Sequence, residues 1–102
     1  MSAEGNNAAR RALRLLFVLQ GHVSDGLRLK QVAEAMQTTP STALRDLQTL
    51  ADEGIAERLP GNDECWRLSP RVVQIAVATQ QEFARMRART DELEQRYMRD
   101  PS

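Results

Sequence analysis

Two copies of one helix-start signal divide this 102-residue chain and constrain its fold more than any other feature. Thr39-Pro40 and Ser69-Pro70 each place a hydroxyl side chain directly before a proline. The hydroxyl oxygen can accept a free amide of the first helical turn, and proline fits the first helical position because it has no N–H to satisfy. The sequence therefore predicts one helix over residues 40–53 and another over residues 70–99.

The segment before Pro40 also has helical periodicity. Apolar residues recur at spacings of three and four over residues 8–20, which predicts a helix with Asn6 or Asn7 as its cap. Residues 27–29 alternate apolar and basic side chains like a short strand, and residues 30–36 follow as a second, shorter helix. The apolar positions of the first helix are Ala9, Ala12, Leu13, Leu16, Phe17 and Leu19.

After Gly54, which is expected to close the third helix in a left-handed conformation, the apolar period changes from helical to strand-like. Residues 55–59 and 65–68 are predicted as two strands, joined by the turn-forming residues 60–64. The order helix, short strand, helix, turn, helix, hairpin, helix is that of a winged helix-turn-helix. We therefore expect a mainly α fold with a small β-hairpin wing, followed by a long C-terminal helix.

The expected organisation has four parts. Residues 1–7 are a flexible N-terminus and residues 8–69 are the winged helix-turn-helix, with DNA binding as its expected role. Residues 70–99 are a long dimerisation helix, and residues 100–102 are a flexible tail.

The formal net charge is zero, from 14 basic and 14 acidic residues. A binder of phosphates usually carries an excess of positive charge, so this balance argues against nucleic acid at first sight. The charges are segregated, however: residues 1–50 carry +2, residues 51–69 carry −3 and residues 70–102 carry +1. Zero net charge is therefore compatible with a DNA binder of weak non-specific affinity, which depends on dimerisation and on base contacts.

Several other classes of protein are disfavoured. The longest apolar run, residues 15–19, is far shorter than the roughly 20 residues of a membrane span, and the polar N-terminus favours a cytoplasmic protein. A single cysteine, Cys65, and a single histidine, His22, disfavour a disulfide framework, a metal site and a catalytic acid–base pair. We therefore expect no metal, no cofactor and no enzymatic activity.

The third predicted helix is short enough to lie in a DNA major groove about 12 Å wide. Hydroxyls at its start can bond phosphates and base edges, and an arginine one turn further on has the reach for a bidentate contact to guanine. The alternative is that Ser41 and Thr42 only cap the helix and that Arg45 is a solvated surface charge. The candidate reading residues are Thr39, Ser41, Thr42 and Arg45, and the candidate phosphate contacts are Arg10, Arg11, Arg14, Arg28 and Lys30.

Four stretches, residues 29–35, 41–50, 54–58 and 66–70, resemble the N-terminal DNA-binding domain of IclR-type transcriptional regulators. The most specific parts are the Ser-Thr-x-x-Arg-x-Leu-Gln-Thr-Leu pattern of the third helix and the Trp-Arg-Leu that closes the wing. The resemblance runs over residues 8–78. It implies a dimeric domain that reads double-stranded DNA through the third helix, with Ser41, Thr42 and Arg45 at the reading positions.

The chain departs from the family pattern in two places. Typical members continue into a larger effector-sensing domain, so no small-molecule effector domain of that kind is expected here. In addition, Asp63 and Glu64 stand in the predicted wing turn, where many winged helices carry basic residues. Phosphate would repel these carboxylates, which leaves Arg58 and Arg67, nearer the base of the hairpin, as the candidate wing contacts.

The last predicted helix carries a heptad pattern that favours pairing with a second copy of the chain. Glu82 then matches Arg87, and Arg89 matches Glu94, across a parallel pair. An antiparallel pair stays open, as does a helix whose start packs on the wing while the rest frays. The candidate dimerisation residues are Val72, Ala76, Thr79, Phe83, Met86, Thr90, Leu93 and Tyr97.

Two functions are compatible with these patterns. The first is a sequence-specific transcriptional regulator, a small homodimeric repressor that reads a pseudo-palindromic operator with residues 40–53. The second is a winged-helix module for protein interaction or assembly without sequence-specific DNA binding, which the acidic wing and the zero net charge favour.

Overall fold

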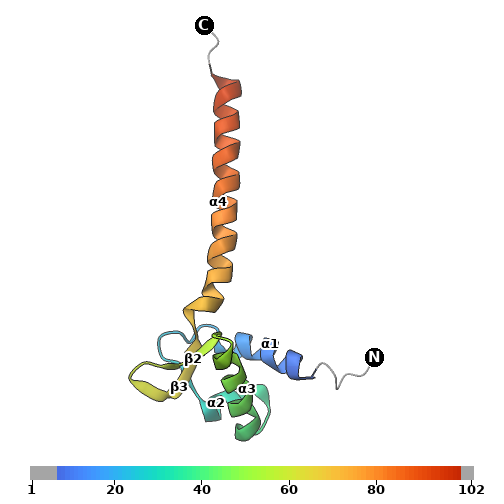
Figure 1. Cartoon of the computed structure of the whole chain (residues 1–102), viewed down its shortest axis with the longest axis vertical. Coiled ribbons are helices and arrows are strands. Elements are labelled where there is room, and N and C mark those ends of the chain that lie inside the picture. Colours follow the sequence, from blue (N-terminus) through green and yellow to red (C-terminus); the bar gives the residue numbers. More distant parts are fainter. Residues whose placement is uncertain (1–6, 100–102) are drawn as a thin grey trace. The chain divides into compact units, whose positions relative to one another are not determined.

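The computed structural model describes residues 7–99 and confirms a winged helix-turn-helix with a long helix after it. The flexible ends expected at residues 1–6 and 100–102 lie outside the described residues, whereas Asn7 is the first helical residue and not part of a flexible end. The chain divides after Val72 into two units, which are described separately. The elements are α1 (Asn7–Leu19), β1 (Leu27–Arg28), α2 (Leu29–Met36), α3 (Pro40–Asp52), β2 (Ala56–Leu59), β3 (Asn62–Leu68) and α4 (Pro70–Met98) (Figure 1).

The first unit is built around one hydrophobic core that α1, α2, α3 and the sheet share. Its largest fully buried side chains are Leu15, Leu19, Val32 and Leu47. Burial of each such side chain contributes roughly 1.5–3 kcal/mol to folding. Ala33, Ala43, Leu50, Ala56 and Trp66 complete the buried cluster.

Helix α1 has two apolar stripes, and only one of them packs on the core. Leu15 and Leu19 are fully buried, and Ala12 and Leu16 pack beside them. Leu13 and Phe17, two of the apolar positions that predicted this helix, are 59% and 70% exposed. They lie four residues apart along a second stripe, on the solvent side of the helix.

The predicted helix boundaries at Thr39 and Gly54 are confirmed. The Thr42 amide donates to the Thr39 hydroxyl oxygen at 3.2 Å, so Thr39 is the cap of α3. Gly54 has φ of +76° and follows the end of α3 in the left-handed region, which glycine adopts with little strain. Helix α4 begins at Pro70 as expected, and the hydroxyl of Ser69 donates to the Gly54 carbonyl oxygen.

The three strands form an antiparallel sheet in the order β1-β3-β2, with Leu27 opposite Trp66 and Ala56 opposite Leu68. The wing is longer than the sequence suggested because β3 begins at Asn62. Asp63 and Glu64, expected in the turn, therefore lie on β3, and both are exposed. The turn itself is only Pro60-Gly61, with Gly61 at φ +82°, as in a type II turn.

The second unit consists of α4 after its first turn. The helix runs for 29 residues, and none of them is buried within the described chain. None of the described helices is long and apolar enough to cross a membrane. The exposed large apolar residues of α4 are Val73, Ile75, Val77, Phe83, Met86, Leu93, Tyr97 and Met98.

Candidate nucleic-acid interface

A three-residue turn joins α2 to α3 and sets the position of the third helix. Gln37 adopts φ 55° and ψ 47°, the left-handed conformation that usually favours glycine. The amides of Gln37 and Thr38 donate to the carbonyls of Glu34 and Ala33, so the turn closes the end of α2. This compact connection and the buried face of α3 hold the other face of α3 toward solvent.

The exposed face of α3 is a polar stripe. Ser41, Arg45 and Gln48 are all exposed, and their spacings of four and three put them on one side of the helix. Ala43, Leu47 and Leu50 are buried on the opposite side. A rigid helix that carries a hydroxyl, a guanidinium and an amide along one face offers donors and acceptors for base edges in a major groove.

Gln48 is a candidate that the sequence interpretation missed. It follows Arg45 by one turn and shares its solvent exposure. A glutamine amide can bond the N6 and N7 positions of adenine in a bidentate manner, which complements a guanine contact from arginine. The signal was present in the sequence as the three-residue spacing from Arg45, within the motif quoted for the family resemblance.

The hydroxyls at the start of α3 have different roles. The Thr39 hydroxyl caps the helix and also lies 3.1 Å from the Thr42 hydroxyl oxygen. Thr42 is only half-buried, and Ser41 and Thr39 are exposed. The capping interpretation therefore holds for Thr39, while Ser41 keeps an exposed hydroxyl on the stripe.

Arg11 was expected on the exposed side of the first helix, ready to contact phosphate. Its Nε instead donates to Asp46 Oδ2 at 2.8 Å, and its Nη2 lies 3.4 Å from Asp46 Oδ1. The hydrogen bond to Asp46 and the charge of that carboxylate raise the pKa of the Arg11 guanidinium above its ordinary value. Arg11 thus ties α1 to α3 through Asp46, the neighbour of Arg45 in the sequence, and its guanidinium is already engaged.

The other four candidate phosphate contacts are exposed. Arg10 and Arg14 lie one turn apart on α1, Arg28 ends β1, and Lys30 lies in the first turn of α2. The Arg28 amide donates to Gln31 Oε1 at 2.9 Å, which fixes the start of α2 through the backbone and leaves the Arg28 side chain exposed.

The two wing arginines are anchored within the fold. The Arg58 guanidinium carbon lies 4.4 Å from the centroid of the buried Trp66 ring, and its Nη1 donates to the Asp63 carbonyl at 2.7 Å. Arg67 pairs with Glu57, with Nε and Nη2 both 2.8 Å from Oε2, and its Nη1 donates to the Val23 carbonyl at 3.2 Å. Arg58 remains exposed at the surface, whereas Arg67 is half-buried and holds the hairpin together.

The remaining chemistry of the described residues is sparse. No group of three histidine, cysteine or carboxylate side chains within residues 7–99 could hold a metal ion. Cys65 is buried in β3 as a free thiol.

Comparison with solved structures finds the same fold in MepR. A point mutant of MepR from a multidrug-resistant S. aureus clinical isolate superposes with a TM-score of 0.51 at 17% identity, over 87% of this chain and 78% of that chain. A point mutant of Lactococcus lactis ZitR matches with a TM-score of 0.47 at 16% identity, over 84% of this chain and 59% of that one. No curated protein matches the sequence at a significant level.

The family comparison is more specific than the likeness of fold. The family model of the IclR helix-turn-helix domain matches residues 8–60, about half of the chain. This range begins in α1 and ends in the hairpin turn, so it contains α2, the turn at Gln37 and the whole exposed stripe of α3. The chain therefore belongs to the IclR helix-turn-helix domain family.

Proposed function

We propose that this chain is a sequence-specific transcriptional regulator that acts on double-stranded DNA in the cytoplasm as a small homodimeric repressor. The single observation that carries the proposal is the exposed stripe of Ser41, Arg45 and Gln48 on a helix whose opposite face is buried. Membership of the IclR helix-turn-helix family supports the same function. No catalytic step is part of the proposal.

In this proposal α3 lies in the major groove and reads one half-site. Arg45 donates to O6 and N7 of a guanine, and Gln48 bonds an adenine about one helical turn further along α3. The exposed hydroxyl of Ser41, in the first turn of α3, bonds a base edge or a neighbouring phosphate. Two copies read half-sites about 34 Å apart, as expected for a dimer on one face of B-DNA, and repression follows because the bound dimer blocks the polymerase.

Phosphate contacts position the protein on the duplex without reading its sequence. The exposed side chains of Arg10, Arg14, Arg28 and Lys30 are proposed for this role. Arg11 and Arg67 are not needed for it, because Asp46 and Glu57 already pair with their guanidinium groups.

The test is selection of bound sequences from a random duplex pool, followed by affinity measurements on the selected site. A two-fold symmetric consensus with half-sites one helical turn apart is expected. Arg45→Ala should cost about 1–3 kcal/mol on the selected site and relax the preference at one base position in each half-site. Arg14→Ala is the matched control, since loss of a phosphate contact weakens binding to every sequence about equally. Equal losses for Arg45→Ala on selected and random DNA would contradict a reading role.

The second candidate function is a protein-interaction or assembly module. The exposed carboxylates of Asp63 and Glu64 on β3 favour it, because they would be repelled by a nearby phosphate backbone. A salt series on mixed duplex DNA separates the two functions. A protein that uses several phosphate contacts loses affinity steeply as the salt concentration rises, whereas an interaction module shows no such binding.

A further inference from the structure

We infer that α4 pairs with the α4 of a second copy in a parallel, in-register two-stranded coil. The inference rests on the proposed homodimer and adds the orientation of its two helices. It is carried by the exposed seam of α4, by the change in side-chain chemistry along the helix, and by the charges that flank the seam.

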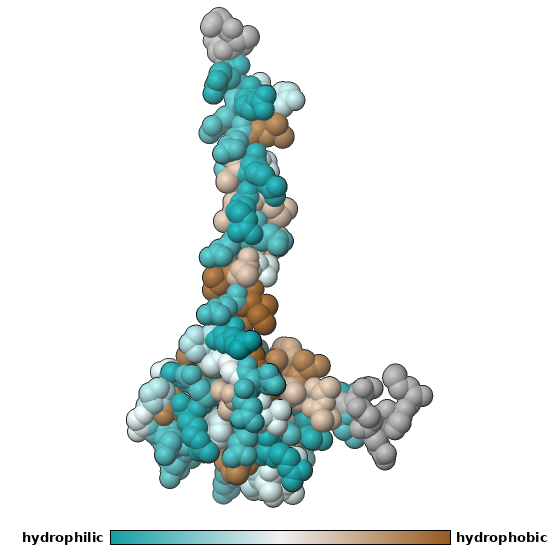
Figure 2. All heavy atoms as spheres, viewed as in Figure 1, coloured by the Kyte–Doolittle hydropathy of each residue, from teal (hydrophilic) through white to brown (hydrophobic). Residues whose placement is uncertain are grey.

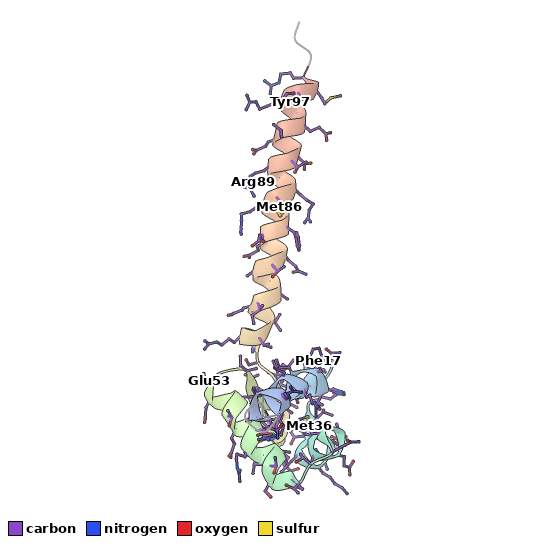
Figure 3. The ribbon with its side chains drawn as sticks, turned by 90° about the vertical axis from the view of Figure 1, so that its right-hand side faces the viewer. Phe17, Met36, Glu53, Met86, Arg89 and Tyr97 are labelled. Atoms are coloured by element: carbon purple, nitrogen blue, oxygen red, sulfur yellow. The ribbon has the colours of Figure 1, made fainter. Side chains whose placement is uncertain are left out.

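The seam is the stripe of α4 that has no partner in the described chain, and it consists of Val72, Ala76, Thr79, Phe83, Met86, Thr90, Leu93 and Tyr97. Phe83, Met86 and Leu93 are 51%, 47% and 54% exposed, and together with Thr90 they follow the alternating three- and four-residue spacing of a coiled coil. Figure 3 marks Met86 and Tyr97 along the same helix. Two shallow hollows in the surface of α4 share Met86 and Thr90, one extending to Phe83 and the other to Leu93. Hollows between side chains of one helix are the places where the knobs of a facing helix insert.

The chemistry beside the seam changes along α4. Near its start the flanking positions are apolar, with Val73 49% and Ile75 68% exposed. Further along, the equivalent positions carry Arg87, Arg89 and Glu94. Figure 2 shows this change as brown surface over the first turns of α4 and mainly teal surface beyond them.

This gradient favours the parallel arrangement. In a parallel, in-register pair, Ile75 lies opposite the uncharged Gln80 of the partner subunit, and the charged turns lie beside charged turns. An antiparallel pair that covers the whole seam would set Val73 and Ile75 against the charged half of the partner. The charged groups would then lose water without gaining a partner of opposite charge, which is unfavourable.

The charged residues in the C-terminal half of α4 also favour the parallel, in-register pair. Glu82 lies opposite Arg87 of the partner subunit, and Arg89 lies opposite Glu94 of the partner subunit. Each such exposed ion pair contributes little to affinity, so the pairs select the alignment and the apolar seam supplies the attraction. Both winged domains are then attached to the same end of the coil, as reading of two neighbouring half-sites requires.

Cysteine cross-linking of the full chain tests the orientation. Thr79→Cys and Leu93→Cys are made separately in a Cys65→Ala background, which removes the natural thiol. Both positions lie on the seam, one toward each end of α4, and in a parallel, in-register pair each faces its own counterpart closely enough for a disulfide. Ala88→Cys, on the far side of the helix from the seam, is the matched control.

Mild oxidation should shift both seam variants from a monomeric to a dimeric band in a denaturing, non-reducing gel, while the Ala88→Cys variant stays monomeric. The native mass of each reduced variant is measured first by light scattering. If the variants have a dimeric mass but either seam position fails to cross-link to its own counterpart, the parallel register is overturned and the proposed dimer stays intact. A monomeric mass for all variants and for the unmodified chain would overturn the dimer itself.

Discussion

Met86 and Met98 provide a comparison of two identical side chains that differ in their position on α4. Met86 lies on the seam and is 47% exposed, whereas Met98, the last residue of α4, points away from the seam and is 78% exposed. Full burial of a methionine side chain is worth roughly 1.5–3 kcal/mol, so the exposed half of Met86 can contribute about 1 kcal/mol on association. A symmetric dimer contains two copies, so Met86→Ala should weaken association by about 2 kcal/mol, which raises the dimer Kd roughly 30-fold.

Sedimentation equilibrium over a wide range of protein concentration measures this Kd directly. Met98→Ala is the control and should leave the Kd nearly unchanged, although it removes the more exposed side chain. Circular dichroism of both variants checks that the helix persists, which is expected because alanine is the strongest helix former. Equal weakening by the two substitutions, or a larger effect of Met98→Ala, would refute the assignment of the seam and favour non-specific association of exposed apolar surface.

Four further substitutions, one of them a control, test the first unit. Leu47→Ala removes a fully buried side chain and should cost about 2–5 kcal/mol of unfolding free energy in urea denaturation, whereas Gln48→Ala on the exposed stripe should stay within about 0.5 kcal/mol. Thr39→Ala removes the cap of α3 and should cost about 1 kcal/mol in the same assay without DNA. Gln37→Gly relieves a left-handed conformation that costs a non-glycine residue about 1–2 kcal/mol, but glycine loses about 0.5–1 kcal/mol more entropy on folding. A Tm equal to or a few degrees above the parent is therefore expected for Gln37→Gly, and a clear fall in Tm would contradict this reasoning.

Local signals in the sequence predicted the boundaries of α3 and α4. The cap at Thr39, the proline at position 70 and the left-handed Gly54 each act within a few residues, so neighbouring residues suffice to predict them. The hairpin was predicted, but its start on β3 was wrong. The register shift between Arg58 and Leu59 depends on how β2 and β3 pair, and no local pattern encodes that.

The inner face of α1 could not be chosen from periodicity alone. Leu13 and Phe17 follow the same helical spacing as Leu15 and Leu19, and only packing against α2 and α3 decides which stripe is buried. Figure 3 marks Phe17 on α1.

The role of Arg11 depends on a residue that is far away in the sequence. In the sequence it stands beside Arg10 and resembles it, yet its carboxylate partner Asp46 lies 35 positions away. The exposed stripe of α3 could be predicted from the sequence in part. Ser41 and Arg45 were predicted as reading residues, whereas Gln48, one turn after Arg45, was not included.

If the chain acts as the proposed homodimer, the absence of buried residues along α4 within the described chain links protein abundance to operator occupancy. A helix without tertiary support gains its stabilisation when it pairs, so the chain can present two reading helices to DNA only above the dimer Kd. Below that concentration, occupancy of a two-fold operator rises with the square of the total protein concentration, and above it the dependence becomes linear. In the proposed dimer, the residues of the seam would therefore set the amount of protein at which the regulator begins to act, independently of the bases proposed to be read by α3.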